Sequence, residues 1–185
     1  MPNATFVSAE PVFTSPRFSL VRETFATSQG AVERPVIHHP GAVAIIAQPD
    51  PGHLVLVRQF RYPVRRWTLE IPAGTREPGE APAATAAREL REEAGYAAAR
   101  FIELASFYPA LGVSDELMVL FRAEGLTPVA AGPDPGELVT RQVVALSALP
   151  GLLAEGELGD AKTLIALAVL GLGVLVPGKT VAHAH

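Results

Sequence analysis

Apolar and polar residues alternate in short runs along residues 1–38, with the period of two that is typical of half-buried β-strands. The predicted strands cover residues 5–7, 12–14, 18–23 and 31–37, and Ser28-Gln29-Gly30 predicts a turn. A small antiparallel sheet is only marginally stable by itself. We therefore expect residues 1–38 to form a β extension that packs on the rest of the chain or on a second subunit.

Continuous apolar runs, which are typical of buried strands, follow this segment. Residues 41–47 and 53–60 flank the turn residues Pro49-Asp50-Pro51-Gly52 and predict a hairpin. Further strands are expected at residues 68–71, 101–107, 116–121 and 139–146. A helix is expected from Pro82, which suits a first turn, to Gly95, which suits a C-terminal cap. Two more helices are expected at residues 147–154 and 160–171.

This order of elements predicts an α+β fold, an α/β/α sandwich around a mixed β-sheet. We expect three regions: the antiparallel β extension at 1–38, the main domain at 39–176, and a frayed tail at 177–185. The apolar run at 164–176 is shorter than the roughly 20 residues of a membrane-spanning helix, so it predicts a buried core helix. We do not take the tail residues His183 and His185 as a metal site.

The charge and composition of the chain exclude several classes of function. The net charge is −4 and the isoelectric point is about 5.7, so no basic field is available to hold a nucleic acid. The absence of cysteine excludes disulfides, thiolate zinc sites and a cysteine nucleophile. The first residues lack the basic and apolar regions of a signal peptide. We therefore expect a cytoplasmic protein that binds neither nucleic acid nor membrane.

Candidate chemistry gathers on the helix predicted after Gly74. Glu89, Glu92 and Glu93 are three and four residues apart, so they share one face of that helix, where like charges repel. A hard divalent cation such as Mg²⁺, which takes oxygen ligands, would relieve the repulsion. The alternative is a solvated acidic face interleaved with Arg88 and Arg91.

The segment from Gly74 to Tyr96 resembles the Nudix box, a pattern of glycine, glutamate, Arg-Glu, Glu-Glu and glycine at fixed spacing. The matching positions are Gly74, Glu80, Arg88, Glu89, Leu90, Glu92, Glu93, Gly95 and Tyr96. The resemblance implies a Nudix hydrolase fold and a Mg²⁺ cofactor, with Mn²⁺ as a substitute ion. The metal ligands that it implies are Ala73 (through its carbonyl), Glu89, Glu92 and Glu93. It also implies that Arg88 orients a glutamate and that Glu80 is a ligand or an anchor.

A wider resemblance points to the ADP-ribose pyrophosphatase branch of Nudix hydrolases, which cleave nucleoside diphosphate sugars. It covers residues 56–63, 70–74 and 156–163, within a similarity that runs from about residue 40 to 167. The branch implies a substrate pocket lined by Arg58, Gln59, Arg61 and Glu70. An arginine suits a phosphate because its fork donates two hydrogen bonds. The alternative is that Arg58 and Arg61 simply face solvent.

A general base is expected on the loop at residues 124–138, because a mobile loop can close over a substrate. Glu137 matches the glutamate of the branch better than Asp134 does, and Glu93 is the alternative base. The catalytic residues implied are therefore Glu92, Glu93 and Glu137.

One departure from the branch concerns the loop Tyr108-Pro109-Ala110-Leu111-Gly112. Leu111 stands where the branch has a proline that accompanies ADP-ribose preference, whereas Ser114-Asp115-Glu116 matches. We expect Leu111 and Gly112 to contact the substrate, and the identity of the nucleotide sugar stays open, GDP-mannose included.

The resulting hypothesis is a Mg²⁺-dependent hydrolase of the pyrophosphate bond in ADP-ribose or a related nucleoside diphosphate sugar, yielding a nucleoside monophosphate and a sugar phosphate. One alternative keeps the enzyme but makes the substrate a nucleoside triphosphate or a dinucleoside polyphosphate. Another is a nucleotide-sugar sensor without turnover. The resemblance also implies a homodimer formed through residues 1–38.

Overall fold

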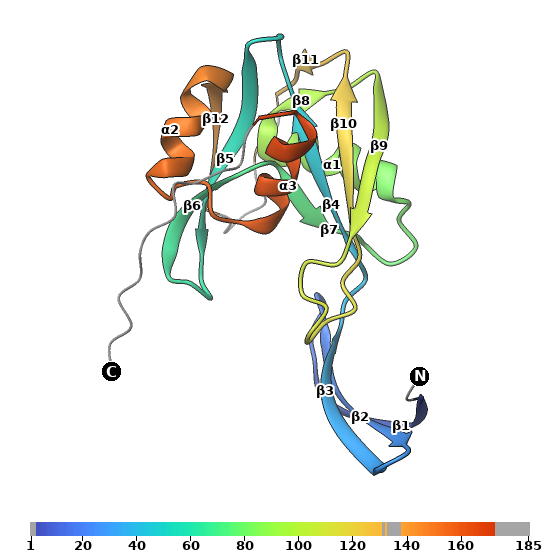
Figure 1. Cartoon of the computed structure of the whole chain (residues 1–185). Helices are drawn as coiled ribbons and strands as arrows, with labels where there is room; N and C mark the ends of the chain where they lie inside the picture. Colours follow the sequence, from blue (N-terminus) through green and yellow to red (C-terminus); the bar gives the residue numbers. More distant parts are fainter. Residues whose placement is uncertain (1–2, 131, 133–137, 173–185) are drawn as a thin grey trace, which may run out of the picture.

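The computed structural model describes residues 3–130, 132 and 138–172 (Figure 1). The strands are β1 (Ala4–Thr14), β2 (Ser19–Thr27), β3 (Gly30–His38), β4 (Ala42–Ala47), β5 (His53–Arg61), β6 (Arg66–Glu70), β7 (Ala73–Thr75), β8 (Tyr96–Ala97), β9 (Arg100–Phe107), β10 (Met118–Glu124), β11 (Thr127–Pro128) and β12 (Val139–Ala145). The helices are α1 (Pro82–Ala94), the short 3₁₀-helix η1 (Leu146–Ala148), α2 (Leu149–Ala154) and α3 (Ala161–Val169). None of the helices in these described stretches is long and apolar enough to cross a membrane.

The body of the molecule contains a mixed four-stranded sheet in the order β7-β4-β10-β9. Strands β4 and β10 are parallel, whereas β4 with β7 and β10 with β9 are antiparallel. A separate antiparallel sheet has the order β12-β5-β6. The predicted α+β class with a mixed sheet is therefore confirmed.

The predicted hairpin of β4 and β5 is wrong, because the two strands belong to different sheets. Strand β4 is buried along its whole length and pairs with β10, which comes much later in the chain. Apolar side chains on both faces indicate burial, but they do not indicate which strand lies alongside.

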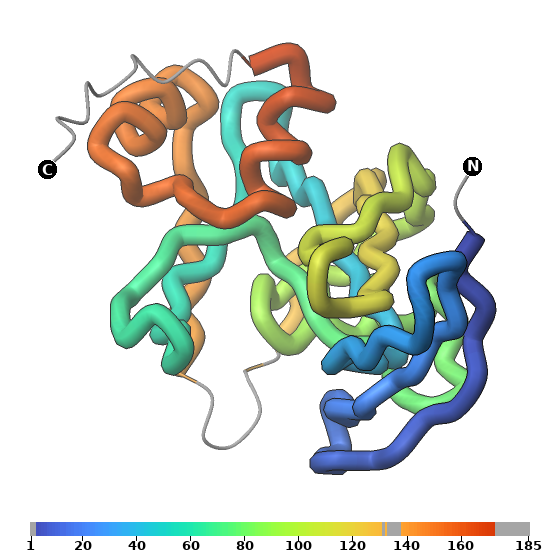
Figure 2. The backbone as a smooth tube through the Cα atoms, turned by 60° about the horizontal axis from the view of Figure 1, so that its bottom comes forward, coloured from blue at the N-terminus to red at the C-terminus, as the bar shows by residue number. Residues whose placement is uncertain are grey.

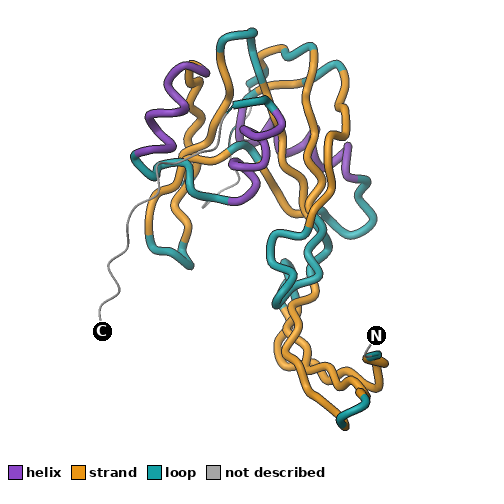
Figure 3. The backbone as a smooth tube through the Cα atoms, viewed as in Figure 1, coloured by secondary structure: helices purple, strands orange, loops and turns teal. Residues whose placement is uncertain are grey.

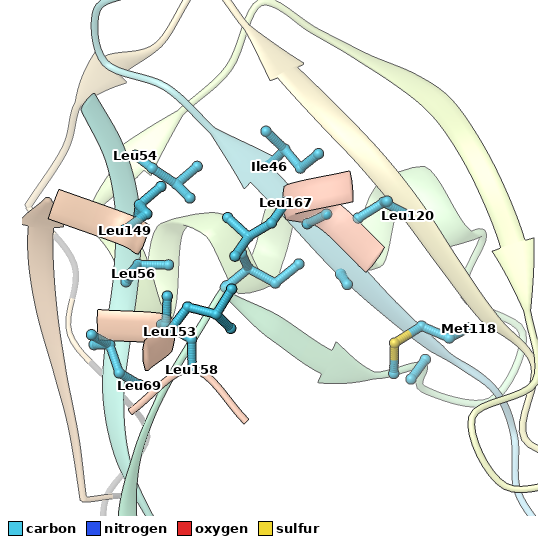
Figure 4. Packing of buried hydrophobic residues seen from close by; sticks show 14 residues of the cluster. Ile46, Leu54, Leu56, Leu69, Met118, Leu120, Leu149, Leu153, Leu158 and Leu167 are labelled. Atoms are coloured by element: carbon cyan, nitrogen blue, oxygen red, sulfur yellow. The ribbon is translucent and has the colours of Figure 1, made fainter. Parts of the chain in front are cut away.

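Helices cover both faces of β4 and so complete the predicted α/β/α sandwich. Ala44 and Ile46 belong to a core with residues of α2 and α3, whose packing Figure 4 shows around Ile46, Leu153 and Leu167. The intervening residues of β4 face a second core that contains residues of α1. Burying one leucine side chain contributes about 1.5–3 kcal/mol, so the second core, which includes Leu90, holds α1 against the sheet.

Helix α1 begins and ends where the sequence predicts. Pro82 lies in the first turn, and Gly95 has the left-handed φ of 66° from which its N–H reaches the carbonyls of Leu90 and Arg91. On the apolar side of the helix, Ala86 and Leu90 are fully buried, whereas Ala83 near its start is exposed.

Several other predicted limits shift in the structure. The strand expected from residue 116 begins at Met118, and the helix expected from residue 147 is divided between η1 and α2. The tail at 177–185 lies outside the described residues.

Strands β1, β2 and β3 form an antiparallel sheet that projects from the body, on the side away from α2 (Figures 1 and 2). Its first strand is continuous, not two pieces as predicted, because pairing with β2 continues across irregularities near Ser8 and Phe13. Pro11 is tolerated there since β1 is an edge strand. Phe6, Val12 and Phe13 of β1 are each more than half exposed.

The projecting sheet contacts the body through the loop that joins β9 to β10, drawn beside β3 in Figure 3. Ile37 of β3 forms a bridge with Ser114 of that loop. His38 places its two ring nitrogens 2.6 Å from Asp115 Oδ2 and 3.0 Å from Glu23 Oε1. The carboxylate of Asp115 raises the pKa of His38, so this junction is held most firmly when the histidine is protonated.

Candidate active site

The candidate site forms where β7 passes across α1, beside Arg88, Glu89 and Glu93 in the middle and the C-terminal half of the helix. Gly74 of β7 lies against the carboxyl group of Glu89 so closely that a β-carbon at position 74 would be 1.9 Å from Glu89 Cδ. Only glycine leaves the space for this carboxylate. The glycine at the start of the box, Gly74, therefore makes room for the glutamate of the Arg-Glu pair, Glu89.

Arg88 organises the carboxylates of the helix. Its Nη1 donates to Glu89 Oε1 at 2.6 Å and to Glu92 Oε2 at 3.1 Å. Its Nε and Nη2 reach the two oxygens of Glu80, and Nη2 also donates to the carbonyl of Thr75 on β7. The arginine thus offsets the repulsion among the glutamates and ties α1 to β7.

Glu80 serves as an anchor in this arrangement. Besides Arg88, its carboxylate accepts from Thr85 Oγ1 at 2.8 Å and from the N–H of Glu77 at 3.1 Å. The Arg88 guanidinium is the main reason that the pKa of Glu80 falls from 4.5 to about 2. Both carboxylate oxygens of Glu80 accept hydrogen bonds from the protein. The residue does not line the cleft beside the other glutamates.

A cleft of about 440 Å³ opens over these groups. Its lining includes Gln59 and Arg61 of β5, Ala73 and Gly74 of β7, and Glu89, Glu92 and Glu93 of α1. Glu93 is buried, and its Oε2 accepts a hydrogen bond of 2.9 Å from the N–H of Ala73. The structure therefore brings the predicted metal ligands to one wall of one cleft.

These ligands suit a hard divalent cation by their chemistry, since they offer carboxylate oxygens and a backbone carbonyl. Within the described residues, no three acidic or histidine side chains already converge on one point. The geometry explains this, because Arg88 holds Glu89 and Glu92 while Ala73 holds Glu93. Binding an ion would require the carboxylates to turn partly away from Arg88.

Gln59 and Arg61 project into the cleft from the same face of β5, as alternation along a strand requires. The Oε1 atom of Gln59 is buried without a hydrogen-bond partner among the described residues. A buried acceptor left unpaired costs about 1–3 kcal/mol. A ligand hydroxyl or amino group that donates to Gln59 Oε1 would recover that loss.

Arg61 is fixed by Glu70, the last residue of β6. Its Nε and Nη2 donate to the two oxygens of Glu70 at 2.8 and 2.6 Å, so Nη1 is the guanidinium nitrogen outside this fork. Glu70 is only 2% exposed and also accepts from Thr68 Oγ1. Although we expected Glu70 to contact the substrate, the structure buries it behind Arg61, which makes it the holder of that arginine.

Lys162 completes this buried network, and the sequence argument did not assign it a role. Its ammonium group donates to Glu70 Oε2 and, at 2.8 Å, to Asp160 Oδ1. Asp160 caps α3 by accepting from the N–H groups of Lys162 and Thr163. Burial raises the pKa of Glu70, but the hydrogen bond from Arg61 and the charge of Lys162 outweigh it and lower the pKa to about 2. The only sequence signal for this network was the similarity of residues 156–163 to the branch.

Three other predicted site residues lie elsewhere. Arg58 points to the opposite face of β5, where its Nη1 is 3.1 Å from Glu157 Oε2. Leu111 and Gly112 line a different pocket, shared with residues of the N-terminal sheet. Their contact with a substrate stays a prediction, since the structure does not bring them to this cleft within one chain. Glu137 and its alternative Asp134 lie outside the described residues.

Replacing Gly74 with alanine tests the close approach of Glu89. Because the group that must give way is the end of a flexible side chain, the fold should persist while the carboxylate moves. We expect kcat/KM for nucleotide-sugar hydrolysis to fall about tenfold or more. Activity typically falls by this much when a group that positions a metal ligand is disturbed. The matched control is Gly151→Ala on α2, where a β-carbon meets nothing within 4 Å. Equal activity of the two variants would contradict the proposed role of Glu89.

Comparison with known proteins gives one family over most of the chain. The model of the NUDIX domain matches residues 37–167. An ADP-ribose pyrophosphatase of Bacillus subtilis (strain 168) is 38% identical over 169 residues, which span 90% of this chain and 91% of the relative. A methanol dehydrogenase activator of Bacillus methanolicus is 40% identical over 142 residues, covering 76% of this chain and 77% of that protein.

A solved structure shows the same likeness in three dimensions. It is described as the crystal structure of an ADP compounds hydrolase and superposes with a TM-score of 0.76 at 25% identity. The match covers 91% of this chain and 92% of the other. Because it extends over nearly the whole of both chains, the likeness includes the N-terminal sheet as well as the body.

Proposed function

The chain belongs to the NUDIX family of hydrolases, and on that premise we propose that it hydrolyses the pyrophosphate bond of ADP-ribose or a related nucleoside diphosphate sugar. The products are a nucleoside monophosphate and a sugar phosphate. The observation that carries the proposal is the shared cleft, where the glutamates of α1 meet Arg61 and the unpaired Gln59 Oε1. The similarity to an ADP-ribose pyrophosphatase over 90% of the chain supports the substrate class.

The proposal assigns a Mg²⁺ ion, with Mn²⁺ as its substitute, to Glu89, Glu92, Glu93 and the carbonyl of Ala73. Such an ion neutralises phosphate charge and lowers the pKa of a bound water. Because Arg88 already balances part of the negative charge, these carboxylates can sit together before an ion binds.

The other groups of the cleft act on the substrate directly. Arg61, held in place by Glu70, donates from Nη1 to a phosphate oxygen. Such a hydrogen bond is strong because both groups are charged. Gln59 Oε1 accepts a hydrogen bond from a hydroxyl group of a ribose. Glu93, fixed by the N–H of Ala73, accepts a proton from the attacking water, a role for which Glu137 is the alternative. Phosphoryl transfer depends chiefly on this kind of positioning.

An assay of the purified protein with ADP-ribose and Mg²⁺ tests the proposal. We expect AMP and ribose 5-phosphate in equal amounts, and no product when the ion is removed with a chelator. A panel of nucleoside diphosphate sugars, GDP-mannose included, would identify the preferred sugar and base. Inorganic pyrophosphate released from nucleoside triphosphates would instead indicate the triphosphate alternative. Binding of these ligands without turnover would indicate a sensor and contradict hydrolysis.

The proposal also includes a homodimer in the cytoplasm, in which residues 1–38 form the dimer contact. The exposed apolar side chains of β1, including Phe6, Val12 and Phe13, support this role for the extension. One chain has a mass of 19.5 kDa, and light scattering at micromolar concentration should give twice that value. A monomer at that concentration would contradict the dimer, and cell fractionation tests the location.

A further inference from the structure

Ile71 and Pro72 form a buried crossover between two sheets. They follow β6, which pairs with β5, and precede β7, which pairs with β4 (Figure 1). The carbonyl of Pro72 accepts from the N–H of Ile45 on β4 at 2.9 Å, but a proline has no backbone N–H to donate. The N–H of Ile71 is therefore the one backbone donor of the crossover. It donates to Oγ1 of Thr163 at 3.0 Å, 92 residues later in the chain.

Thr163 lies in the first turn of α3, where the cap of the helix fixes its side chain. The side chain is fully buried, and its Oγ1 donates to Oδ2 of Asp160, the N-cap residue. The other oxygen, Asp160 Oδ1, accepts from the N–H and from the ammonium group of Lys162 at 3.1 and 2.8 Å. One capping carboxylate therefore orients two neighbouring side chains, Lys162 and Thr163, toward the segment that joins β6 to β7.

Lys162 acts on the substrate side of this segment. Its ammonium group donates to Glu70, whose carboxylate forks the guanidinium of Arg61. Because Lys162 shares that carboxylate, Glu70 offsets less of the charge that Arg61 offers to a phosphate. Without the ammonium group, the carboxylates of Glu70 and Asp160 would exceed the guanidinium by one negative charge, beside a substrate that is itself an anion.

Thr163 acts on the metal side of the same segment. The residue that it holds, Ile71, lies two positions before Ala73. Ala73 donates its N–H to Glu93 and offers its carbonyl to the proposed ion. Without the hydroxyl of Thr163, the buried N–H of Ile71 would lose its acceptor, and the crossover would be free to shift relative to α1. A shift of this kind would move the carbonyl of Ala73 away from the glutamates.

We propose that the first turn of α3 sets the substrate arginine and the metal ligands in position, with Lys162 acting through Glu70 and Thr163 acting through the crossover. The inference rests on the proposed function of the cleft and adds two positioning residues, neither of which lines that cleft. It gives them different effects, since Lys162 governs the affinity for the substrate and Thr163 the affinity for the ion. Groups that orient a metal ligand are typically worth about 10–100-fold in metal affinity or activity.

Calorimetric titration of the protein with Mn²⁺ alone tests the role of Thr163. Thr163→Val keeps the shape of the side chain and removes the hydroxyl, so the Kd for Mn²⁺ should rise about tenfold or more. Thr163→Ser keeps the hydroxyl and should bind Mn²⁺ nearly as tightly as wild type. The stoichiometry of each titration gives the folded fraction, so a loss of stability is not mistaken for a loss of affinity. An unchanged Kd for Thr163→Val would overturn the role of Thr163.

Lys162→Met tests the substrate side, because methionine keeps most of the length of the side chain without its charge. We expect the KM for ADP-ribose at saturating Mg²⁺ to rise about tenfold, on the scale of one unit charge acting near a protein surface. The Kd for Mn²⁺ should stay near the wild-type value. The rise in KM should shrink as NaCl is added, because salt screens the excess negative charge. A rise that does not depend on salt would show a purely structural role and overturn the assignment.

Leu167→Ala is the matched control on the same helix. Leu167 lies one turn beyond Thr163, is 2% exposed and belongs to the apolar core. Its replacement should lower the melting temperature, because it leaves a cavity, while the Kd for Mn²⁺ and the KM for ADP-ribose stay near the wild-type values. If Leu167→Ala changes both constants as much as the other two variants do, the effects follow from lost stability and the inference is wrong.

The two constants also separate this inference from the proposed hydrolysis. If wild type binds ADP-ribose without turnover, hydrolysis fails as a function, and the Kd for ADP-ribose takes the place of KM. Weaker binding by Lys162→Met than by Leu167→Ala would then still support the role of Lys162. If wild type hydrolyses ADP-ribose and neither Lys162→Met nor Thr163→Val changes its constant, the inference alone is overturned.

Discussion

Replacing Glu93 with glutamine is expected to reduce the kcat/KM for hydrolysis of ADP-ribose at least about a hundredfold. Mutating a residue that only positions a metal ligand already lowers activity about 10–100-fold, and Glu93 is proposed to bind the metal directly. Glu93 is 7% exposed and receives the N–H of Ala73 at 2.9 Å, so its position is fixed before any ligand binds. Glutamine fills the same volume but removes the negative charge and the ability to accept a proton. Initial rates at saturating Mg²⁺ measure the effect.

The control for this variant is Glu155→Gln, an exposed residue next to the end of α2. It should retain the wild-type rate, and both variants should melt near the wild-type temperature. If Glu93→Gln keeps more than about a third of the wild-type kcat/KM, the assignment of this residue as metal ligand or base is wrong, since a real ligand is worth far more.

The largest effect on stability is expected from Glu70→Gln. The change leaves Arg61 and Lys162 facing a neutral amide in a site where Glu70 is 2% exposed. Removing one partner of a buried ion pair costs about 3–5 kcal/mol in the free energy of unfolding. Urea denaturation at pH 7 measures the change.

Glu157→Gln provides the matched comparison, because it removes the carboxylate from an exposed arginine pair. Arg58 and Glu157 each leave 39% of their side chains in solvent, where such pairs contribute about 0–1 kcal/mol. If both variants lose the same stability, the buried network does not hold α3 to β6 as the structure indicates.

The same residue should shape the response of the protein to acid. The pKa of Glu70 is about 2 in the folded state, below its ordinary value of 4.5. A lowered folded pKa means that its stabilisation is complete above pH 4.5 and is lost as the pH falls toward 2. Wild type should therefore lose more stability than Glu70→Gln over that interval. Parallel losses in the two proteins would show that Glu70 does not titrate in this way.

The box and its helix were predictable because their signals are local. Pro82 and Gly95 act on the backbone beside them, and the spacing of Glu89, Glu92 and Glu93 places them on one face without reference to the rest of the fold. The need for Gly74 was visible as a motif position, but its physical reason, the carboxylate that occupies the space of a side chain, was not.

The wider pocket was predicted less well, because neighbouring residues of a strand take opposite faces. Arg58 and Arg61 share one segment, yet the first pairs with Glu157 and the second reaches the cleft. Glu70 was expected to contact the substrate, whereas its burial turns it into a support for Arg61. No pattern within the segment distinguishes a ligand from the residue that holds it.

The sequence by itself determined the family, the α+β class, the limits of α1 and the acidic face that α1 presents, since each depends on residues close together in the chain. Tertiary structure alone decided that β4 pairs with β10 instead of β5, that Lys162 neutralises Glu70, and that Thr163 holds the N–H of Ile71. Those contacts join segments far apart in the sequence. They depend on how two cores stack the helices on the sheet, for which no local pattern exists.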